Sequence, residues 1–377
     1  MKKLHILQVV EASSGGVGRH VIDLSLGLLR SGHQTDIVYS QARSDPLFHR
    51  GLEQVRDIGG RTIHFEIASG LSFHDYVPIL QIRKLLKQNH YDIIHLQSSK
   101  AGLVGRIAAM RLPMTKIYTP HLLRTASPGL GFVGRLIFGQ SERLLAQITD
   151  RILCVSNFEL NHALKLGIPI EKLIYSPNGY LPPPMRSRDE VRLELGLVAD
   201  DLVFGFIGRL APQKDPLTLI SAFAQVRLDQ PCKLVIVGGG ELMDQCVSLV
   251  SRLGIQEKVR FLGHVDSTKY IAAFDVFVMS SLSESFPYVL LEAAAAHLPL
   301  ISTSVGDIPE LIQDRENGLL SSCGNVDELA QHMTELGSNP ELRKMLRQKI
   351  SHLTTEYTVD SMVQKTLDIY LSLLLKQ

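Results

Sequence analysis

The sequence predicts an α/β protein made of two doubly wound domains, and three observations support this prediction. A chain of 377 residues exceeds what one hydrophobic core usually serves, so two domains are expected. Short apolar runs alternate with helical patterns in both halves, which is typical of parallel sheets joined by crossover helices. The segment Ser176–Met185 contains Asn-Gly and three successive prolines, and we predict that it is the linker.

The first half begins with a strand–helix–strand unit. Leu4–Val10 is an apolar run, residues 13–18 form a glycine-rich turn, and His20–Arg30 has apolar residues at helical spacing. Thr35–Ser40 is the expected second strand. Further short strands are predicted at Asp92–Leu96, Lys116–Thr119 and Arg151–Val155.

The second half repeats this alternation. Strands are predicted at Val203–Ile207, Lys233–Val237, Val259–Leu262, Val276–Met279 and Leu300–Ser302. Helices are predicted at Leu217–Val226, at Met243–Leu253, from about Tyr288 to Ala296, and from Asp327 to near the end of the chain. In such folds ligands bind beyond the carboxyl ends of the strands.

Composition and cysteine spacing favour an ordinary soluble protein of a reducing cytosol. Hydrophobic residues make up 45% and charged residues 20% of the chain. None of the four cysteines belongs to a Cys-x-x-Cys pair, so neither a zinc site nor a disulfide framework is predicted. The apolar start is broken by His5 and Gln8, which favours a buried strand over a signal peptide. No window reaches the roughly 18 consecutive apolar residues of a spanning helix.

The net charge of +1 hides a difference between the halves. Residues 1–180 contain 21 Lys or Arg and 13 Asp or Glu, a balance of +8, and the remainder contains 18 and 25, a balance of −7. The excess is densest from Arg83 to Arg143, with ten cationic side chains against Asp92 and Glu142. A basic face attracts an anionic surface or substrate. The alternative is a solvated face without a partner.

The most informative segment has two glutamates seven residues apart, in Glu284-Ser285-Phe286-Pro287-Tyr288-Val289-Leu290-Leu291-Glu292. With a helix starting near Pro287, Glu284 precedes the helix and Glu292 lies on it. The backbone N–H groups and dipole at a helix start suit a diphosphate, and carboxylates suit sugar hydroxyls. Without further support, a loop carboxylate and a solvated helix residue explain the two glutamates equally well.

A basic loop supplies that support. Gly208-Arg209-Leu210-Ala211-Pro212-Gln213-Lys214 follows the predicted strand Val203–Ile207, where an α/β domain presents ligand-binding loops. Arg209 offers phosphate a planar fork and Lys214 a compact charge. Each residue alone would be read as a surface cation, but together they predict an anion site.

The order of these motifs resembles glycosyltransferase family 4. It runs from the Gly-Gly loop through Thr-Pro-His, Pro-Asn-Gly and Gly-Arg-Leu-x3-Lys to Glu-x7-Glu, and it covers nearly the whole chain. The resemblance implies the GT-B fold, with two Rossmann-like doubly wound domains facing across a deep cleft. It also implies a nucleotide-sugar donor and retention at the anomeric carbon. We therefore expect an acceptor-binding domain at 1–180, a nucleotide-sugar-binding domain at 181–358, and a helix within 359–377, about Val359–Leu374, that crosses back to the first domain.

The resemblance also assigns roles to single residues. Gly15 and Gly16 would let the backbone approach the donor phosphate and the acceptor, although the turn is not a complete Gly-x-Gly-x-x-Gly fingerprint. Arg209 and Lys214 would neutralise the diphosphate. Glu284 and the backbone of Ser285, Phe286 and Pro287 would hold donor-sugar hydroxyls, with Tyr288 beside them, and Glu292 would bind the ribose. His264, in Leu262-Gly263-His264, would flank the base.

His121 matches the family histidine that lies at the donor sugar and the acceptor. The family often continues this motif with Gly, whereas this chain has Leu122-Leu123-Arg124, which leaves the shape of the loop open. Glu284 and His121 are the expected catalytic residues, and they would orient the sugar rather than attack it. His20 and His95 carry no such support.

No metal or cofactor is expected, since no two aspartates stand two positions apart in an Asp-x-Asp motif. Arg209, Lys214 and helix N–H groups would stabilise the leaving diphosphate instead. The family's proposed front-face route, in which the donor phosphate helps to deprotonate the acceptor hydroxyl, is preferred to a covalent adduct. The expected donor is a UDP-hexose or UDP-N-acetylhexosamine, with GDP-mannose as the alternative.

The acceptor is expected to be a glycan or a polyprenyl-diphosphate-linked sugar of bacterial polysaccharide or glycolipid assembly, and no nucleic acid is expected. Ile79–Leu86 and Phe132–Leu145 are basic and amphipathic, so they could rest on an anionic membrane surface from the cytoplasmic side. Helices that face the core are the alternative. Two other functions stay open, a nucleotide-sugar epimerase of the same fold and a non-catalytic nucleotide-sugar-binding protein. A nicotinamide oxidoreductase is disfavoured.

Overall fold

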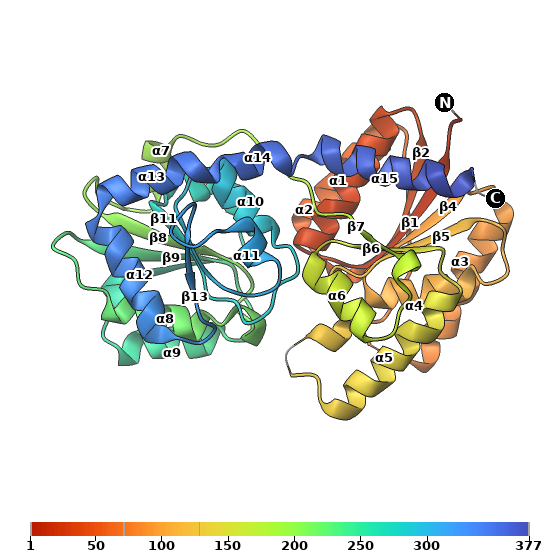
Figure 1. Ribbon diagram of the computed structural model, residues 1–377. Coiled ribbons are helices and arrows are strands. Elements are labelled where there is room, and N and C mark those ends of the chain that lie inside the picture. The colour runs from red at the N-terminus through yellow and green to blue at the C-terminus, as the bar shows by residue number, and fades with distance from the viewer. Residues whose placement is uncertain (1, 71, 128, 376–377) are drawn as a thin grey trace. The chain divides into compact units, whose positions relative to one another are not determined.

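The computed structural model describes residues 2–70, 72–127 and 129–375. The chain divides into two compact units. The first comprises Met1–Gly179 and Thr358–Gln377, and the second comprises Tyr180–Tyr357. Each unit holds one parallel sheet covered by helices (Figure 1).

In the described residues of the first unit, seven parallel strands follow the order β3-β2-β1-β4-β5-β6-β7. The strands are β1 His5–Ser13, β2 Gln34–Ser44, β3 Arg61–His64, β4 Ile93–Gln97, β5 Thr115–Thr119, β6 Arg151–Cys154 and β7 Leu173–Tyr175. The order reverses between β1 and β4, which is the switch point where such sheets bind ligands. Register places Gln8 beside His95 and Val10 beside Gln97 on these two strands.

Helices cover both faces of this sheet. They are α1 Gly16–Arg30, α2 Pro46–Asp57, α3 Tyr76–Gln88, α4 Ser99–Ala108, α5 Phe132–Gln147, α6 Asn157–Lys165 and α15 Val359–Leu374. Helix α15 shares a core with α1 and β1, in which Met362, Val363 and Tyr370 are buried with Leu24 and Leu28. A Cβ at Gly27 would lie 2.4 Å from Val363, so a glycine allows this close helix packing.

In the second unit, six parallel strands follow the order β10-β9-β8-β11-β12-β13. The strands are β8 Leu202–Ile207, β9 Cys232–Val237, β10 Val259–Gly263, β11 Val276–Met279, β12 Leu300–Thr303 and β13 Leu319–Ser321. The helices are α7 Arg188–Glu194, α8 Pro216–Gln225, α9 Met243–Arg252, α10 Tyr288–Ala295, α11 Ile308–Leu311, α12 Val326–Ser338, α13 Pro340–Ile350 and α14 His352–Glu356. Here the order reverses between β8 and β11.

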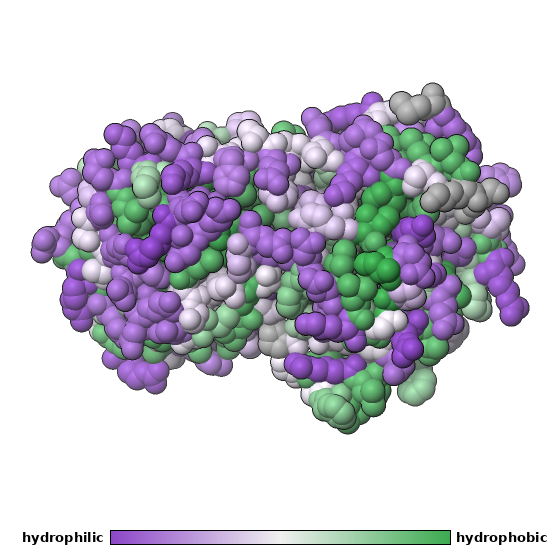
Figure 2. Space-filling view, in the orientation of Figure 1, coloured by the Kyte–Doolittle hydropathy of each residue, from purple (hydrophilic) through white to green (hydrophobic). Residues whose placement is uncertain are grey.

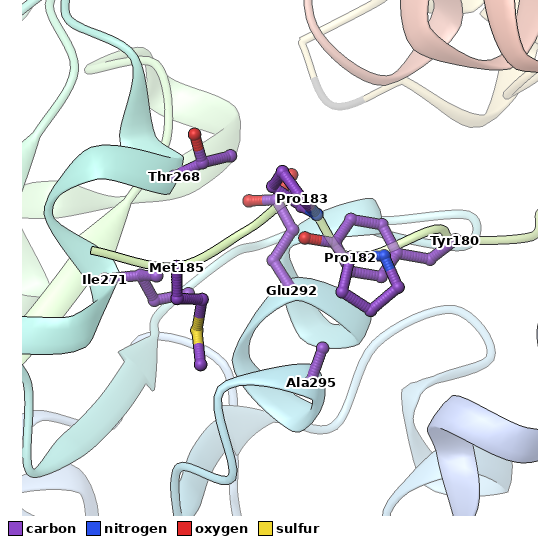
Figure 3. Close-up of a pocket in the computed structure, with 8 residues that line it drawn as sticks. All are labelled: Tyr180, Pro182, Pro183, Met185, Thr268, Ile271, Glu292 and Ala295. Carbon is purple, nitrogen blue, oxygen red and sulfur yellow. The ribbon is translucent and has the colours of Figure 1, made fainter. Parts of the chain in front are cut away.

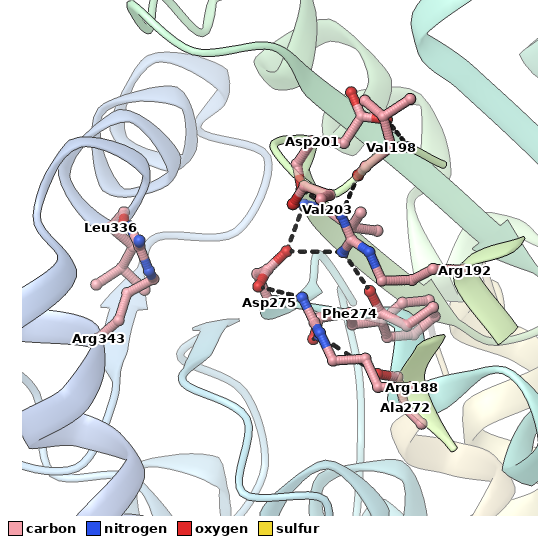
Figure 4. A network of polar contacts seen from close by, with 12 residues as sticks. Arg188, Arg192, Val198, Asp201, Val203, Ala272, Phe274, Asp275, Leu336 and Arg343 are labelled. Carbon is pink, nitrogen blue, oxygen red and sulfur yellow. Dashed lines mark hydrogen bonds and ion pairs between the residues drawn. The ribbon is translucent and has the colours of Figure 1, made fainter. Parts of the chain in front are cut away.

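An ion-pair network anchors the start of the second unit. Arg188 and Arg192 of α7 converge on the carboxylate of Asp275, at N–O distances of 2.7 and 3.4 Å (Figure 4). Asp275 also accepts a hydrogen bond from the backbone N–H of Val203, at the beginning of β8. The segment that precedes α7 is therefore held at this end.

The predicted strands and most predicted helices are confirmed within a few residues. The first helix begins at Gly16 rather than at His20. The prediction of helix from Asp327 onward was too coarse, because the chain forms α12, α13, α14 and α15 in succession. Asn339 caps the second of these with Pro340 in its first turn, a sequence that ends one helix and starts another.

The two predicted amphipathic stretches differ in the structure. Ile82 and Leu86 of the first stretch are buried, so it faces the core. In α5 the apolar side chains point outward, with Val133, Leu136 and Leu144 exposed by 66, 55 and 63%. Of the ten cations between residues 83 and 143, two are buried in ion pairs, Lys100 with Asp75 and Arg106 with Glu142. No described helix is both long and apolar enough to cross a membrane.

Candidate active site

The predicted basic loop lies at the switch point of the second sheet. It leaves β8, makes a single 3₁₀ turn at Pro212–Lys214, and enters α8 through Asp215 at a φ of +45°. The Oγ of Ser280, just after β11, donates to the carbonyl oxygens of Lys214 and Asp215 at 2.9 Å each. The loop after β8 is thus tied to the end of β11.

Within this loop, Lys214 pairs directly with Glu284. The Nζ and Oε1 atoms are 2.5 Å apart, and the side chains are only 20% and 8% exposed. Two neighbours fix the glutamate loop. Gln213 donates from Nε2 to the carbonyl of Ser283 at 2.7 Å. Gly306, at a φ of +56°, approaches so closely that a Cβ there would lie 2.1 Å from the Glu284 carbonyl oxygen.

Helix α10 starts at Tyr288, immediately after this loop, as predicted. Its N-cap is Pro287, and no side chain of the described residues caps it. Ser285 and Phe286 are buried, and the Phe286 ring packs on Tyr357 with ring centres 5.1 Å apart. Arg209 is exposed, and its guanidinium makes no hydrogen bond or ion pair within the described residues. A helix start, a buried ion pair and a free cation therefore occur together at the strand ends.

His264 lies on the neighbouring loop, after β10. A Cβ at Gly239 would lie 2.7 Å from the His264 ring, so the Gly238-Gly239-Gly240 turn after β9 approaches the histidine closely. The His264 side chain is exposed. His264 therefore lies at the end of β10, an edge strand of the second sheet.

Glu292 lines a small pocket of the second unit (Figure 3). The other residues that line it are Tyr180, Pro182, Pro183 and Met185, then Thr268 and Ile271 after β10, and Ala295 of α10. In Figure 3 the Glu292 carboxylate lies beside Pro183. Glu292 is the only predicted donor-site residue among the described residues that line this pocket. Nothing in the sequence indicated that Pro182 and Pro183 would lie beside it.

In the first unit, the glycine turn after β1 starts α1. Gly15 is the N-cap, with a φ of +64°, and its N–H donates to Asp45 at 2.7 Å. Gly16 is the first helical residue. A Cβ at Gly15 would touch nothing, whereas one at Gly18 would lie 1.9 Å from the Ser13 carbonyl oxygen. Within this unit, close packing therefore requires Gly18, and Gly15 is favoured by its positive φ.

The structure brings His121 together with two histidines that the sequence left without a role. The rings of His20 and His121 are 4.7 Å apart and edge to face. His20 Nδ1 is 3.0 Å from Oδ1 of Asn178, which belongs to the Pro-Asn-Gly motif. Burial lowers the pKa of His20 to about 4, although its hydrogen bond with Asn178 opposes the shift. Burial also holds the pKa values of His95 and His121 well below their usual range, so all three are neutral at pH 7.

The loop at His121 is strained where the family often has glycine. His121 has a φ of +60° and Leu122 a φ of +133°, a backbone conformation that leucine rarely adopts. The departure seen in the sequence therefore changes the residue but keeps a glycine-like backbone. Strain of this kind gathers at functional sites.

Comparison with known proteins agrees with this geometry. Residues 14–180 match the family described as Glycosyltransferase Family 4, and residues 187–352 match that described as Glycosyl transferases group 1. The chain belongs to the group 1/family 4 glycosyltransferases. This glycosyltransferase is thus an enzyme of a family of retaining hexosyltransferases that use nucleotide-sugar donors.

Among its relatives is the UDP-Gal:alpha-D-GlcNAc-diphosphoundecaprenol alpha-1,3-galactosyltransferase of Escherichia coli. The two are 28% identical over 314 residues, which cover 80% of this chain and 81% of the relative. The D-inositol 3-phosphate glycosyltransferase of Mycobacterium bovis is 26% identical, over 93% of this chain and 78% of that protein. Anabaena Alr3699/HepE, solved with UDP and glucose, superimposes with a TM-score of 0.84 at 21% identity, covering 98% of this glycosyltransferase and 100% of HepE. The fold is therefore GT-B.

The glycosyltransferase has features that sequence reasoning missed. His20 and Gln97 contact His121, while Asn178 and Gln8 contact these two in turn. Tyr180 and Pro183 line the same pocket as Glu292. His20 lies four residues after Gly16, which is about one helical turn. This spacing could have predicted that His20 lies close to the glycine loop. The two glutamines interrupt apolar strands, and the sequence alone does not show what they contact.

Proposed function

We propose that this enzyme transfers a hexose or N-acetylhexosamine from a UDP-sugar to a hydroxyl of a lipid-linked sugar, with retention and without a metal ion. The observation that carries the proposal is the Lys214–Glu284 pair at the start of α10. Cation, carboxylate and helix start are the groups that a nucleotide-diphosphate sugar requires.

Each group has a physical role in this proposal. Lys214 and Arg209 offset the charge that grows on the diphosphate as the bond to the anomeric carbon breaks. The N–H groups at the start of α10 add a fixed positive potential. Glu284 accepts hydrogen bonds from sugar hydroxyls. The acceptor oxygen bonds to the anomeric carbon, the phosphate leaves, and the acceptor's proton passes to the leaving phosphate. Glu292 binds the ribose from its pocket.

The relatives support the choice of substrates. The E. coli relative is named for a UDP-galactose donor and a diphosphoundecaprenol-linked acceptor, and HepE was solved with UDP. A polyprenyl-diphosphate-linked sugar is therefore our first choice of acceptor, and UDP rather than GDP our first choice of nucleotide.

The outward face of α5 supports attachment to an anionic membrane from the cytoplasmic side. Its described residues bury Gly139, Glu142 and Ala146 on one side, while the exposed side carries Phe132, Val133, Leu136, Ile137 and Leu144. The buried pair of Arg106 and Glu142, with a 2.8 Å N–O distance, holds the helix on α4. Figure 2, which has the orientation of Figure 1, shows hydrophobic residues gathered at the surface over α5.

Charge and position favour a lipid surface as the occupant of this face. The cations that remain exposed between residues 83 and 143 are Lys84, Lys87, Arg111, Arg124, Arg135 and Arg143. Helices α3 and α5 begin beyond the carboxyl ends of their strands, the same edge as His121, and Phe73 and Tyr76 are also exposed there, by 100% and 60%. An apolar and basic edge beside the catalytic histidine suits a lipid-linked acceptor.

The enzymatic proposal is tested by incubating the protein with UDP-galactose, UDP-glucose, UDP-N-acetylglucosamine or GDP-mannose, with EDTA and a short-chain polyprenyl-diphosphate sugar. We expect one UDP-sugar to give an α-linked product, identified by the NMR coupling at its anomeric carbon. Formation of an epimer from the donor alone would indicate a nucleotide-sugar epimerase. Binding of the donor without any turnover would indicate a non-catalytic nucleotide-sugar-binding protein. Loss of product in EDTA would contradict the metal-independent route.

The membrane proposal has its own test, sedimentation with vesicles of phosphatidylglycerol and phosphatidylcholine at low salt. Leu136→Gln with Ile137→Gln should weaken binding by about tenfold or more, because each leaves an apolar contact unmade. Leu193→Gln is the matched control, since Leu193 is 81% exposed on α7 of the second unit. Equal loss in the control, or no binding by the unchanged protein, would remove the membrane proposal and leave the enzymatic one.

A further inference from the structure

A directed chain of buried side chains ends at the candidate catalytic histidine of the first unit. The chain runs from helix α1 across β1 and β4 to the loop after β5. Its members are Ser25, Gln8, Gln97 and His121, of which the first three are fully buried. The network is contained in one compact unit.

The direction of the chain is set at its far end. Ser25 Oγ lies 2.7 Å from the backbone carbonyl oxygen of Val21. Two oxygens at this distance need a proton between them, and only the hydroxyl can supply it, since a carbonyl is an acceptor alone. The Ser25 oxygen is then left to accept, and it does so from Nε2 of Gln8 at 2.8 Å.

This direction passes along the two amides. With its NH₂ group committed to Ser25, Gln8 presents its carbonyl oxygen to Nε2 of Gln97 at 2.9 Å. Gln97 in turn presents its own carbonyl oxygen to Nε2 of His121 at 2.8 Å. An acceptor at that position requires His121 to carry its proton on Nε2.

We propose that Ser25, Gln8 and Gln97 are positioning residues that hold His121 in the neutral Nε2–H tautomer, so that Nδ1 accepts a hydrogen bond from a substrate hydroxyl. Within the described residues Nδ1 has no hydrogen-bond partner. Burial and the nearby His20 and His95 lower the pKa of His121, which keeps the second proton off the ring. The inference rests on the proposed function for the role of the hydroxyl, while the tautomer itself does not.

The tautomer is read directly by long-range ¹H–¹⁵N correlation spectra of protein labelled with ¹⁵N-histidine, in which His121 is identified by its loss in His121→Gln. The unchanged protein should show Nε2–H alone. Ser25→Ala should give a mixture of tautomers and lower kcat by about five- to tenfold, with the KM for donor changed less than twofold, although Ser25 touches no substrate. Ser31→Ala is the matched control, because Ser31 makes the same bond to a carbonyl four residues earlier, at 2.9 Å, outside this chain.

Three results separate the possibilities. An Nδ1–H tautomer in the unchanged protein overturns the proposal whatever the activity. An Nε2–H tautomer that survives both Ser25→Ala and Gln97→Met overturns the relay. Full activity of His121→Gln would instead contradict the catalytic role of His121 in the proposed function, and the tautomer measurement would stand.

Discussion

At the scale of single residues, the Lys214–Glu284 pair has two roles that substitutions can separate. Glu284 is 8% exposed at its side chain and lies 2.5 Å from the ammonium group of Lys214. Removing Lys214 therefore strands a buried carboxylate as well as removing a phosphate ligand. The pair with Glu284 therefore argues that Lys214→Ala also costs stability.

We predict that Lys214→Ala lowers the free energy of unfolding by about 2 kcal/mol and weakens UDP-sugar binding by roughly tenfold to a hundredfold. Lys214→Ala with Glu284→Gln should recover most of the stability and none of the binding, because the neutral amide needs no counter-charge. Chemical denaturation and calorimetric titration measure the two effects. Recovery of binding in the double variant would mean that Lys214 serves the fold alone.

His20 makes a prediction about pH. Its pKa is about 4 in the folded protein and about 6.5 when unfolded, so the unfolded chain binds the extra proton more readily. The stabilising contribution is complete above pH 6.5 and is lost as the pH falls toward 4. Between pH 7 and pH 5, His20 should account for about 2 kcal/mol of lost stability.

The measurement compares unfolding of the unchanged protein and His20→Gln at both pH values. The carboxylates titrate alike in the two proteins, so the difference between them isolates His20. A difference that is the same at pH 7 and at pH 5 would show that the pKa of His20 does not change on folding.

At the scale of elements, the loop after β5 holds Leu122 at a positive φ, a backbone conformation that leucine disfavours. We predict that Leu122→Gly raises the free energy of unfolding by about 1 kcal/mol, since relief of a left-handed φ outweighs the entropy of the added glycine. Leu123→Gly is the matched control. Leu123 is 1% exposed at a φ of −56°, so its replacement should destabilise the fold by about 2 kcal/mol or more. Destabilisation by Leu122→Gly would mean that its packing exceeds its strain.

Much of this architecture could be predicted because each strand of a buried parallel sheet is a short run of apolar residues that can be recognised locally in the sequence. Motif residues such as Lys214 and Glu284 could be predicted singly, but their contact spans 70 positions and depends on the pairing of β8 with β11. Helical periodicity identified α5 as amphipathic, and periodicity cannot say which side faces the core. The orientation of α5 follows from the structure, in which Glu142 is buried against Arg106 and the apolar side chains Leu136 and Leu144 are exposed.

At the scale of the whole molecule, the division of the chain has consequences for ligand binding and stability. Arg209, Lys214, Glu284 and Glu292 all lie between residues 180 and 357, whereas Val359–Leu374 completes the core of the first unit. Several large apolar side chains of α15 are buried in that core. Their loss would cost on the order of 10 kcal/mol, comparable with the whole stability of a domain.

A chain that ends at Tyr357 should therefore lose the folded first unit while it keeps UDP binding, with a Kd within about threefold of the full chain. Calorimetry of thermal unfolding should show one transition fewer than in the full chain. The midpoint temperature of the remaining transition should rise when UDP is added, because a ligand that binds only the folded state stabilises it. Asp360→Ala is the control, since this exposed side chain of α15 lies outside the core. If the shortened chain keeps its second unit folded but no longer binds UDP, then residues of the first unit hold the nucleotide, and Lys214, Glu284 and Glu292 are not sufficient for the donor site.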